Sequence, residues 1–110
     1  MDDLPAEIRT CVDECLRCYQ TCFSMVMGHC LEQGGAHVEP EHFRLMTACA
    51  EVCRTSAHLM LARSDHARHL CRECAEICEA CAKDCERVGD MQPCVDQCRA
   101  CAAACRNMAA

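Results

Sequence analysis

The alternation of apolar and polar positions along the chain predicts four helices separated by short breaks. Apolar residues recur every three or four positions, which is the helical period, and no stretch shows the two-residue alternation of a half-buried strand. Glycines interrupt the pattern at 34–35 and at 89, and Pro40 and Pro93 stand where new helices would begin. The predicted helices cover about residues 5–32, 40–63, 65–88 and 93–107.

The short connections between these helices predict how they pack. Consecutive helices joined by only a few residues lie antiparallel, and four of them form an up-down-up-down bundle. A length of 110 residues fits one domain. We therefore expect an all-α protein in which residues 1–110 form one antiparallel four-helix bundle.

Cysteine occupies most of the positions that should face the axis of this bundle. An α-helix turns by about 100° per residue, so the cysteines of the first and fourth helices each fall in a stripe about 60° wide, and those of the third in a stripe about 80° wide. The second helix places two cysteines beside His42, Met46 and Met60. Such positions normally hold leucine or isoleucine, so the sequence predicts a core lined by sulfur. The stripe cysteines are Cys11, Cys15, Cys18, Cys22, Cys49, Cys53, Cys71, Cys74, Cys78, Cys81, Cys85, Cys94, Cys98, Cys101 and Cys105.

Composition and charge narrow the functions that such a core can serve. The chain has 16 cysteines but one tyrosine, two phenylalanines and no tryptophan, so thiols must replace the usual large core residues. The net charge of −6 argues against nucleic-acid binding, and no apolar run reaches the roughly 18 residues that span a bilayer. The acidic start of the chain lacks an apolar signal region, so we expect a cytoplasmic protein, in which dense cysteine indicates metal binding.

The cysteines recur as seven C-x-x-x-C pairs, and this spacing favours a metal over a disulfide. Residues four apart on a helix have Cβ atoms about 5–6 Å apart, whereas a disulfide needs about 3.5–4.5 Å. Two thiolates at the wider spacing can approach one metal ion from either side, each with a bond of roughly 2.3 Å as in zinc–thiolate sites. Soft sulfur donors with two ligands per ion favour Cu(I), and we expect multiple Cu(I) ions per chain.

Other thiol chemistry competes with copper storage. Zinc needs four thiolates per ion, which would leave about −2 of uncompensated charge at each buried site, whereas one Cu(I) per thiolate is electrically neutral. Iron–sulfur proteins carry cysteine runs that these continuous helices lack. A thiol enzyme needs one distinguished, reactive cysteine, and the sequence offers sixteen similar ones. We therefore expect no catalysis; a zinc–thiolate buffer and a low-stoichiometry copper chaperone remain the alternatives.

One end of the predicted bundle gathers imidazole and thioether ligands. In an antiparallel bundle the end of the first helix meets the start of the second, the end of the third and the start of the fourth. This end, which we call the mouth, brings together Met25, His29, His42, Met46 and Met91. The first four lie on the cysteine stripes of their helices. We interpret the mouth as a gate that passes Cu(I) to the thiols.

Residues away from the stripes and the mouth are expected to play lesser parts. Cys30 lies about 100° from the stripe of the first helix, so a packing role is as well supported as a role as a ligand. Met60 and Met108, near the opposite end, are interpreted as core filler rather than ligands. His37, in the first loop, either reaches the mouth or stays free.

The C-x-x-x-C pairs phased on four helices resemble the bacterial copper storage proteins. The resemblance spans Cys11 to Cys105, which is nearly the whole chain. It implies Cu(I) storage inside the bundle, coordination mainly by pairs of thiolates, a homotetramer and a cytosolic location. We also expect a copper chaperone or a copper enzyme as the partner in copper exchange. The chain departs from the pattern in its second helix, where only Cys49 and Cys53 contribute thiols.

Overall fold

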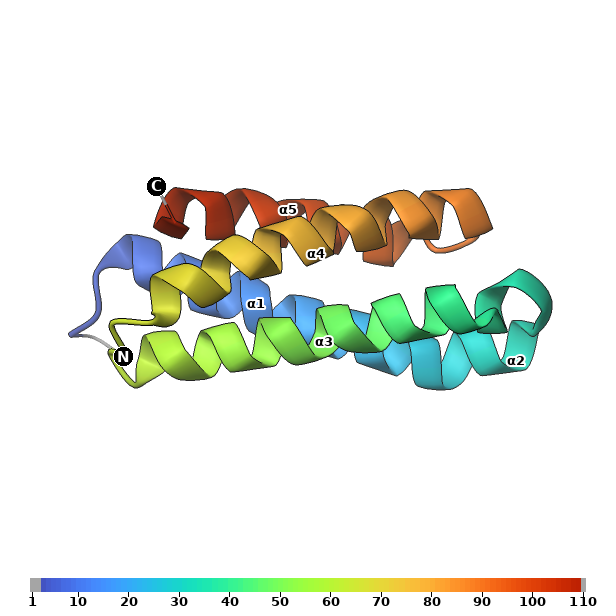
Figure 1. Cartoon of the computed structure of the whole chain (residues 1–110), viewed down its shortest axis with the longest axis horizontal. Coiled ribbons are helices and arrows are strands. Elements are labelled where there is room, and N and C mark those ends of the chain that lie inside the picture. The colour runs from blue at the N-terminus through green and yellow to red at the C-terminus, as the bar shows by residue number, and fades with distance from the viewer. Residues whose placement is uncertain (1–2, 110) are drawn as a thin grey trace.

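The structure, a computed structural model, describes residues 3–109 and consists of long antiparallel helices (Figure 1). The first long rod combines α1 (Ala6–Met25), a π-helical segment (Val26–Cys30) and α2 (Leu31–Gln33). A 3₁₀ turn at Gly35–Val38 leads into the other long helices, which are α3 (Pro40–Leu61), α4 (Ala67–Val88) and α5 (Gln92–Ala109). The predicted all-α four-helix bundle is therefore confirmed.

Each long helix packs against two neighbours, so the four enclose one shared interior. The first rod contacts α3 and α5, and α4 contacts the same two helices. The molecule measures 45 × 22 × 19 Å. In Figure 1 the mouth, with α2 and the turns that flank it, lies at the right. The opposite end, which we call the far end, holds the start of α1, the turn between α3 and α4 and the end of α5. In the described range no helix is long and apolar enough to cross a bilayer.

Glycine and proline define the ends of the helices. Gly34 and Gly89 have φ angles of 68° and 83°, in the left-handed region that a Cβ atom disfavours. Pro40 occupies the first turn of α3, where its missing N–H has no helical partner to lose. At the start of α4 the backbone N–H of His66 donates to Ser64 Oγ at 3.1 Å, and the helix begins only at Ala67, later than the predicted residue 65.

The π-helical segment changes which residues of the first rod face the interior. A π turn holds one residue more than an α turn, so the residues beyond it are rotated by about 100° from the register of a continuous α-helix. Cys30 therefore takes the interior position that residue 29 would hold, and it is fully buried. His29 is turned away from the stripe, with 28% of its side chain exposed. The prediction that Cys30 lies off the stripe was therefore wrong. The prediction that His29 lies on the stripe was also wrong.

Candidate metal centre

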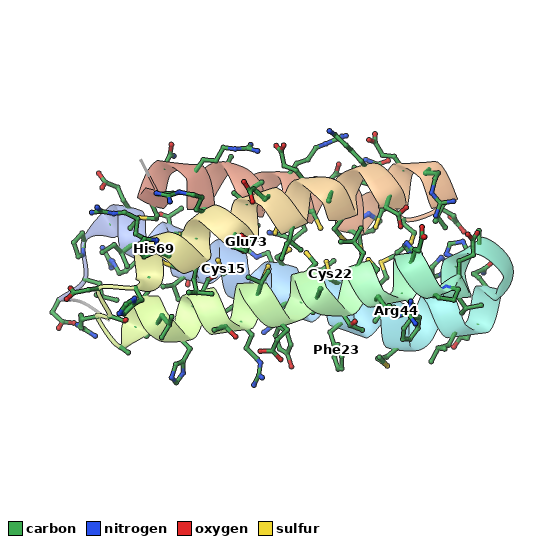
Figure 2. All side chains as sticks on the ribbon, in the orientation of Figure 1. Cys15, Cys22, Phe23, Arg44, His69 and Glu73 are labelled. Atoms are coloured by element: carbon green, nitrogen blue, oxygen red, sulfur yellow. The ribbon has the colours of Figure 1, made fainter. Side chains whose placement is uncertain are left out.

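Reduced cysteine is the commonest residue in the interior of the bundle. All sixteen cysteines are buried and free of disulfides. Figure 2 shows Cys15 and Cys22 between the ribbons, whereas Phe23, the next residue after Cys22, points away from the bundle. The predicted sulfur-lined core is confirmed, because each stripe faces the interior that the four long helices enclose.

Thiols from different helices lie as close together as thiols of one C-x-x-x-C pair. Within α1, the Sγ atoms of Cys18 and Cys22 are 3.9 Å apart. Between helices, Cys22 Sγ lies 3.5 Å from Cys98 Sγ, and Cys53 Sγ lies 3.6 Å from Cys74 Sγ. A disulfide bond would be about 2.03 Å long, so these are contacts between separate thiols. A metal ion held here would therefore link neighbouring helices.

The thiols gather into overlapping groups along the axis. In each group the Sγ atoms all lie within 4.8 Å of one another, which suits ligands of a single ion. Most members belong to two groups, so a metal in one group would share thiolates with a metal in the next. The groups are Cys15, Cys74, Cys101 and Cys105; Cys18, Cys49, Cys53 and Cys78; Cys18, Cys22, Cys49 and Cys98; Cys53, Cys74, Cys78 and Cys101; and, at the far end, Cys11, Cys71 and Cys105.

The wall formed by α3 contains one oxygen among its sulfurs. Cys49, Cys53, Ser56 and Met60 repeat the 0, 4, 7, 11 spacing of the four cysteines in α1. Ser56 is fully buried, and its Oγ atom has no hydrogen-bond partner among residues 3–109. A buried hydroxyl without a partner is costly, so Ser56 marks a stripe position where the chain uses oxygen in place of sulfur.

Neighbouring thiols shift one another's pKa in opposite directions. Hydrogen bonds from Cys22 and Cys49 lower the pKa of Cys81 to about 6. Hydrogen bonds with neighbours, above all Cys101, together with burial, raise the pKa of Cys53. The same causes, with Cys18 as the main neighbour, raise the pKa of Cys98. At neutral pH the core therefore mixes thiolates with thiols that must lose a proton before they bind a metal.

Thioethers join the thiols at the mouth side of the core. Met46 Sδ lies 3.4 Å from the Sγ atoms of both Cys81 and Cys85. Met25 Sδ lies 3.2 Å from Cys94 Sγ. Met46 is fully buried, so it belongs to the sulfur core rather than to the surface of the mouth.

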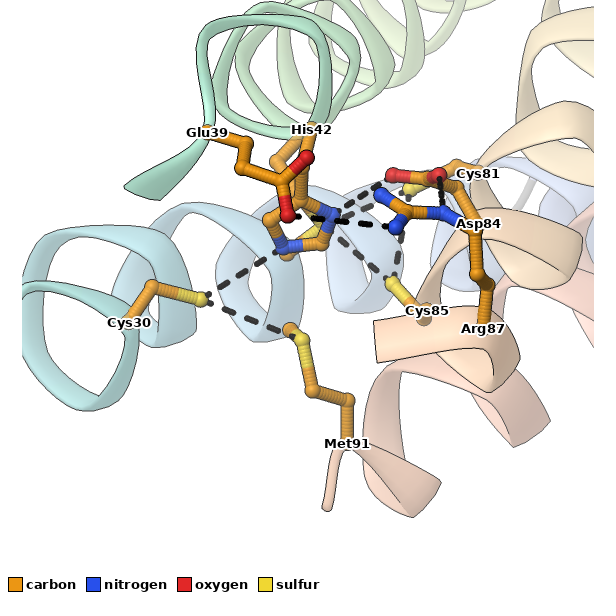
Figure 3. Close-up of polar contacts among 9 residues, drawn as sticks. Cys30, Glu39, His42, Cys81, Asp84, Cys85, Arg87 and Met91 are labelled. Atoms are coloured by element: carbon orange, nitrogen blue, oxygen red, sulfur yellow. Dashed lines mark hydrogen bonds and ion pairs between the residues drawn. The ribbon is translucent and has the colours of Figure 1, made fainter. Parts of the chain in front are cut away.

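A histidine supported by a carboxylate forms the polar part of the mouth (Figure 3). Partial burial would raise the pKa of Asp84, but hydrogen bonds from His42 and Arg87 hold it below its usual value, so Asp84 is a carboxylate. It accepts a hydrogen bond from His42 Nδ1 at 2.7 Å. The Nε2 atom of a neutral His42 then carries the free lone pair, and it lies 3.7 Å from Cys30 Sγ. Metal-binding histidines commonly have such a carboxylate on the second nitrogen.

Cys30 faces two other soft donors across the mouth. Its Sγ atom lies 3.9 Å from Met91 Sδ, in addition to its contact with His42. His37 continues the row of imidazoles, with ring centroids 6.3 Å from His42 and 5.1 Å from His29. Within the described range, His29 Nε2 and His37 Nδ1 are buried atoms without a hydrogen-bond partner. His37, which the sequence left undecided, thus lies at the mouth.

Comparison with known proteins identifies the family. The profile of the copper storage protein family (Csp) matches residues 5–110. The chain belongs to the copper storage protein family. No curated protein sequence matches the chain significantly.

Solved structures agree with this membership of the copper storage protein family. The Nmul_A1745 protein from Nitrosospira multiformis is 52% identical with a TM-score of 0.92, and the match covers 94% of each chain. The Cu(I)-bound copper storage protein BsCsp3 is 33% identical with a TM-score of 0.86, covering 94% of this chain and 99% of that one. Apo-Csp3 (copper storage protein 3) from Bacillus subtilis is 32% identical with a TM-score of 0.76, covering 93% and 98%.

Two residues of the site in this copper storage protein were not anticipated from the sequence. Ser56 carries a usable signal, because it continues the spacing of Cys49 and Cys53 on α3. Asp84 carries none, because it is one of many acidic residues on the helices and only the fold brings it to His42. The position of Cys30 depends on a π turn that no residue pattern announces.

Proposed function

We propose that this chain stores many Cu(I) ions in its core and performs no catalysis. The overlap of the thiol groups supports this proposal most directly. Because thiolates such as Cys18 and Cys101 each belong to two groups, one thiolate can bridge two ions, and a continuous cluster can fill the bundle. A preference for soft sulfur donors favours Cu(I) as the ion.

Zinc would use the same core poorly. At most two of the four-thiol groups have no cysteine in common, so separate tetrahedral sites would occupy eight of the sixteen thiols. Each such site would also carry about −2 of charge in a buried setting. One Cu(I) per thiolate uses all the thiols and leaves the core neutral. This argument favours copper over a zinc–thiolate buffer.

The proposed copper ligands are the cysteines of the core and the methionines and histidines of the mouth. We propose that the fifteen stripe cysteines and Cys30 hold the stored copper. At the mouth, the proposed ligands are Met25, His29, His42, Met46 and Met91. The contacts of Met46 with two cysteines and of His42 with Cys30 support their inclusion.

An anaerobic titration tests the capacity. The reduced apo-protein is titrated with Cu(I) against a competing chelator, and we expect tight uptake of about ten or more ions, on the order of one per thiol. Two matched variants sharpen the result. Ser56→Cys adds a thiol to the α3 wall and is expected to raise the capacity by about one ion, whereas Cys53→Ser is expected to lower it by about one.

The same titration separates the alternatives. Saturation at one or two ions would instead indicate a copper chaperone with structural thiols. An absence of competitive uptake would leave the zinc buffer, and a zinc titration would then saturate at about two ions. Equal capacities in the wild type, Ser56→Cys and Cys53→Ser would contradict storage of one ion per thiol.

We also propose that the mouth is the gate for copper. The row formed by His29, His37 and His42 runs from partly exposed to fully buried positions and ends at Cys30. Two of its nitrogen atoms lack hydrogen-bond partners within residues 3–109, as expected for nitrogens that receive an ion. Asp84 holds His42 with Nε2 directed at the core.

The gate predicts a kinetic effect without a loss of capacity. Replacing both His42 and Met46 with leucine is expected to slow Cu(I) uptake by about tenfold or more, because entering ions lose the donors that lead from the mouth into the thiol core. Stopped-flow mixing with a coloured Cu(I) complex measures the rate. His58→Leu, which changes an exposed histidine on the same helix, is the control and should leave the rate unchanged. A large fall in capacity at an unchanged rate would contradict the gate.

Self-association and a cytoplasmic location complete the proposal. Phe23, Met27 and Leu31 are spaced four residues apart along the first rod and are 41%, 42% and 53% exposed. Tyr19 stacks on Phe23 with ring centroids 5.9 Å apart. Such an outward apolar strip supports the expected homotetramer. Light scattering is expected to give about four times the 12.2 kDa chain mass, and a monomer would contradict it.

A further inference from the structure

The far end of the bundle contains a cavity that the proposed gate does not use. It has a volume of about 460 Å³ and lies between the start of α1, the turn from α3 to α4 and the end of α5. This volume falls in the range of small-molecule sites, which is about 300–1,000 Å³. Its lining divides into an apolar part with Leu4 and Ile8, a part rich in sulfur, and a charged part.

The sulfur part of the cavity adjoins the thiol core directly. Met60, Met108 and Cys71 all line it. Met60 is nearly buried, and its Sδ atom lies 3.8 Å from Cys71 Sγ. Cys71 in turn belongs to the last thiol group of the core, with Cys11 and Cys105. A continuous path of sulfur atoms therefore leads from the cavity into the core.

The charged part of the cavity carries both signs. Arg63, Arg68 and Asp65 line it and are exposed. Arg63 donates a hydrogen bond to Asp3 at 2.5 Å and another to the carbonyl oxygen of Leu61 at 2.7 Å, which fix its guanidinium at the rim. Cations beside an anion suit a ligand that has carboxylates and an ammonium group. A cavity with sulfur atoms next to the thiol core and charges of both signs at its rim therefore fits an amino-acid-like thiol.

We propose that this cavity binds a small zwitterionic thiol of the cysteine or glutathione type and exchanges Cu(I) with it through Met60 and Cys71. Arg68 binds a carboxylate, Asp65 binds the ammonium group, and the sulfur of the ligand faces Met60. The exchange part of this inference rests on the proposed storage function, whereas the binding part does not.

Copper changes ligands in this exchange without changing its oxidation state. In delivery, the bond between Cu(I) and the small thiolate breaks, and a bond between Cu(I) and Cys71 Sγ forms. The proton of the Cys71 thiol passes to the departing thiolate, which leaves as a neutral thiol. The thioether of Met60 contacts Cys71 and offers the ion a soft donor between the two sulfurs. Release follows the same steps in reverse.

Binding is tested on the copper-free protein with S-methylglutathione, which keeps the charged groups but cannot form a thiolate. NMR titration is expected to shift the signals of residues around the cavity. Arg68→Glu reverses one charge at the rim and is expected to weaken binding by at least about threefold. Lys83→Glu makes the same change of charge on an exposed position of the same helix, outside the cavity, and should leave binding unchanged.

Exchange is tested by extracting copper with glutathione from protein loaded to the same number of ions. Met60→Leu keeps an apolar side chain of similar volume but removes the sulfur, and it is expected to slow extraction by about threefold or more. Met27→Leu, at an exposed position of the first rod, is the control. An extraction rate that is equal in Met60→Leu and wild type would overturn the exchange path.

The results of these two experiments can contradict the cavity as a thiol site without contradicting the proposed storage of copper, and the reverse also holds. Absence of S-methylglutathione binding, or equal shifts with inorganic phosphate, would overturn the cavity as a thiol site even if the core stores copper. A chain that takes up no Cu(I) but binds S-methylglutathione at the cavity would overturn storage and exchange while supporting the site.

Discussion

Loading the reduced chain with Cu(I) is expected to raise its melting temperature by more than about 20 °C. Ions bound by the overlapping thiol groups would link all four long helices, because every group draws on at least three of them. Each ion present at 100 times its dissociation constant adds about 2.7 kcal/mol to the free energy of unfolding, provided that the unfolded chain binds it weakly. Several such ions together give the expected shift.

Anaerobic thermal melts followed by circular dichroism measure this effect. The melting temperature should rise stepwise with the number of ions added, and Cys53→Ser, which removes a thiol shared by two groups, should lower the gain. His58→Leu is a suitable control, because its side chain is exposed and away from the thiols. Equal melting temperatures for apo and loaded protein would be incompatible with copper held inside the bundle.

Copper affinity is expected to fall as the pH falls, by about tenfold per pH unit for each proton that an ion displaces. The pKa of Cys53 and that of Cys98 are raised, so these thiols are protonated throughout the neutral range and must release a proton to bind. The pKa of Cys101 is lowered to about 7, chiefly by hydrogen bonds from Cys105 and Cys15. The pKa of Cys81 is about 6, so Cys81 releases a proton on metal binding only at a lower pH than Cys101 does.

The direction of the proton yield follows from these pKa values. At pH 8, Cys81 and Cys101 are already thiolates and contribute no proton, whereas near pH 6 both are partly or fully protonated. The number of protons released per Cu(I) should therefore rise as the pH is lowered from 8 to 6. Titration with Cu(I) in a weakly buffered solution, with added base holding the pH, counts these protons. A yield independent of pH would contradict the assigned directions.

The sequence predicted the fold and the sulfur core because both depend on simple periodicity. Cysteines repeating with the helical period define one face of each helix, and short connections leave only antiparallel packing. Features that depend on backbone irregularity or on contacts across helices were out of reach. The exchange of places between His29 and Cys30 comes from a π turn, and the pairing of His42 with Asp84 depends on how α3 meets α4.

The cavity at the far end shows the same limit. The sequence favours core filler for Met60 and Met108, and the structure places Met60 in a buried position against Cys71. No residue pattern indicates that these methionines share a cavity with Arg63 and Arg68, because a cavity arises from the space left between α1, α5 and a turn. Residue types identify the donors, whereas the three-dimensional packing decides which of them a visiting molecule can reach.

The π-helical segment determines which side chain of the first rod faces the mouth. Its one extra residue places a thiol, rather than an imidazole, opposite His42 and Met91. Deleting a single residue from the segment, such as Gly28, would restore a continuous α-helix and leave Cys30 as the interior donor, because the residue after the deletion moves up to the position that residue 29 of an α-helix holds. The π turn therefore accommodates one extra residue in the first rod, and a chain can gain or lose that residue while the same thiol stays the innermost donor of the mouth.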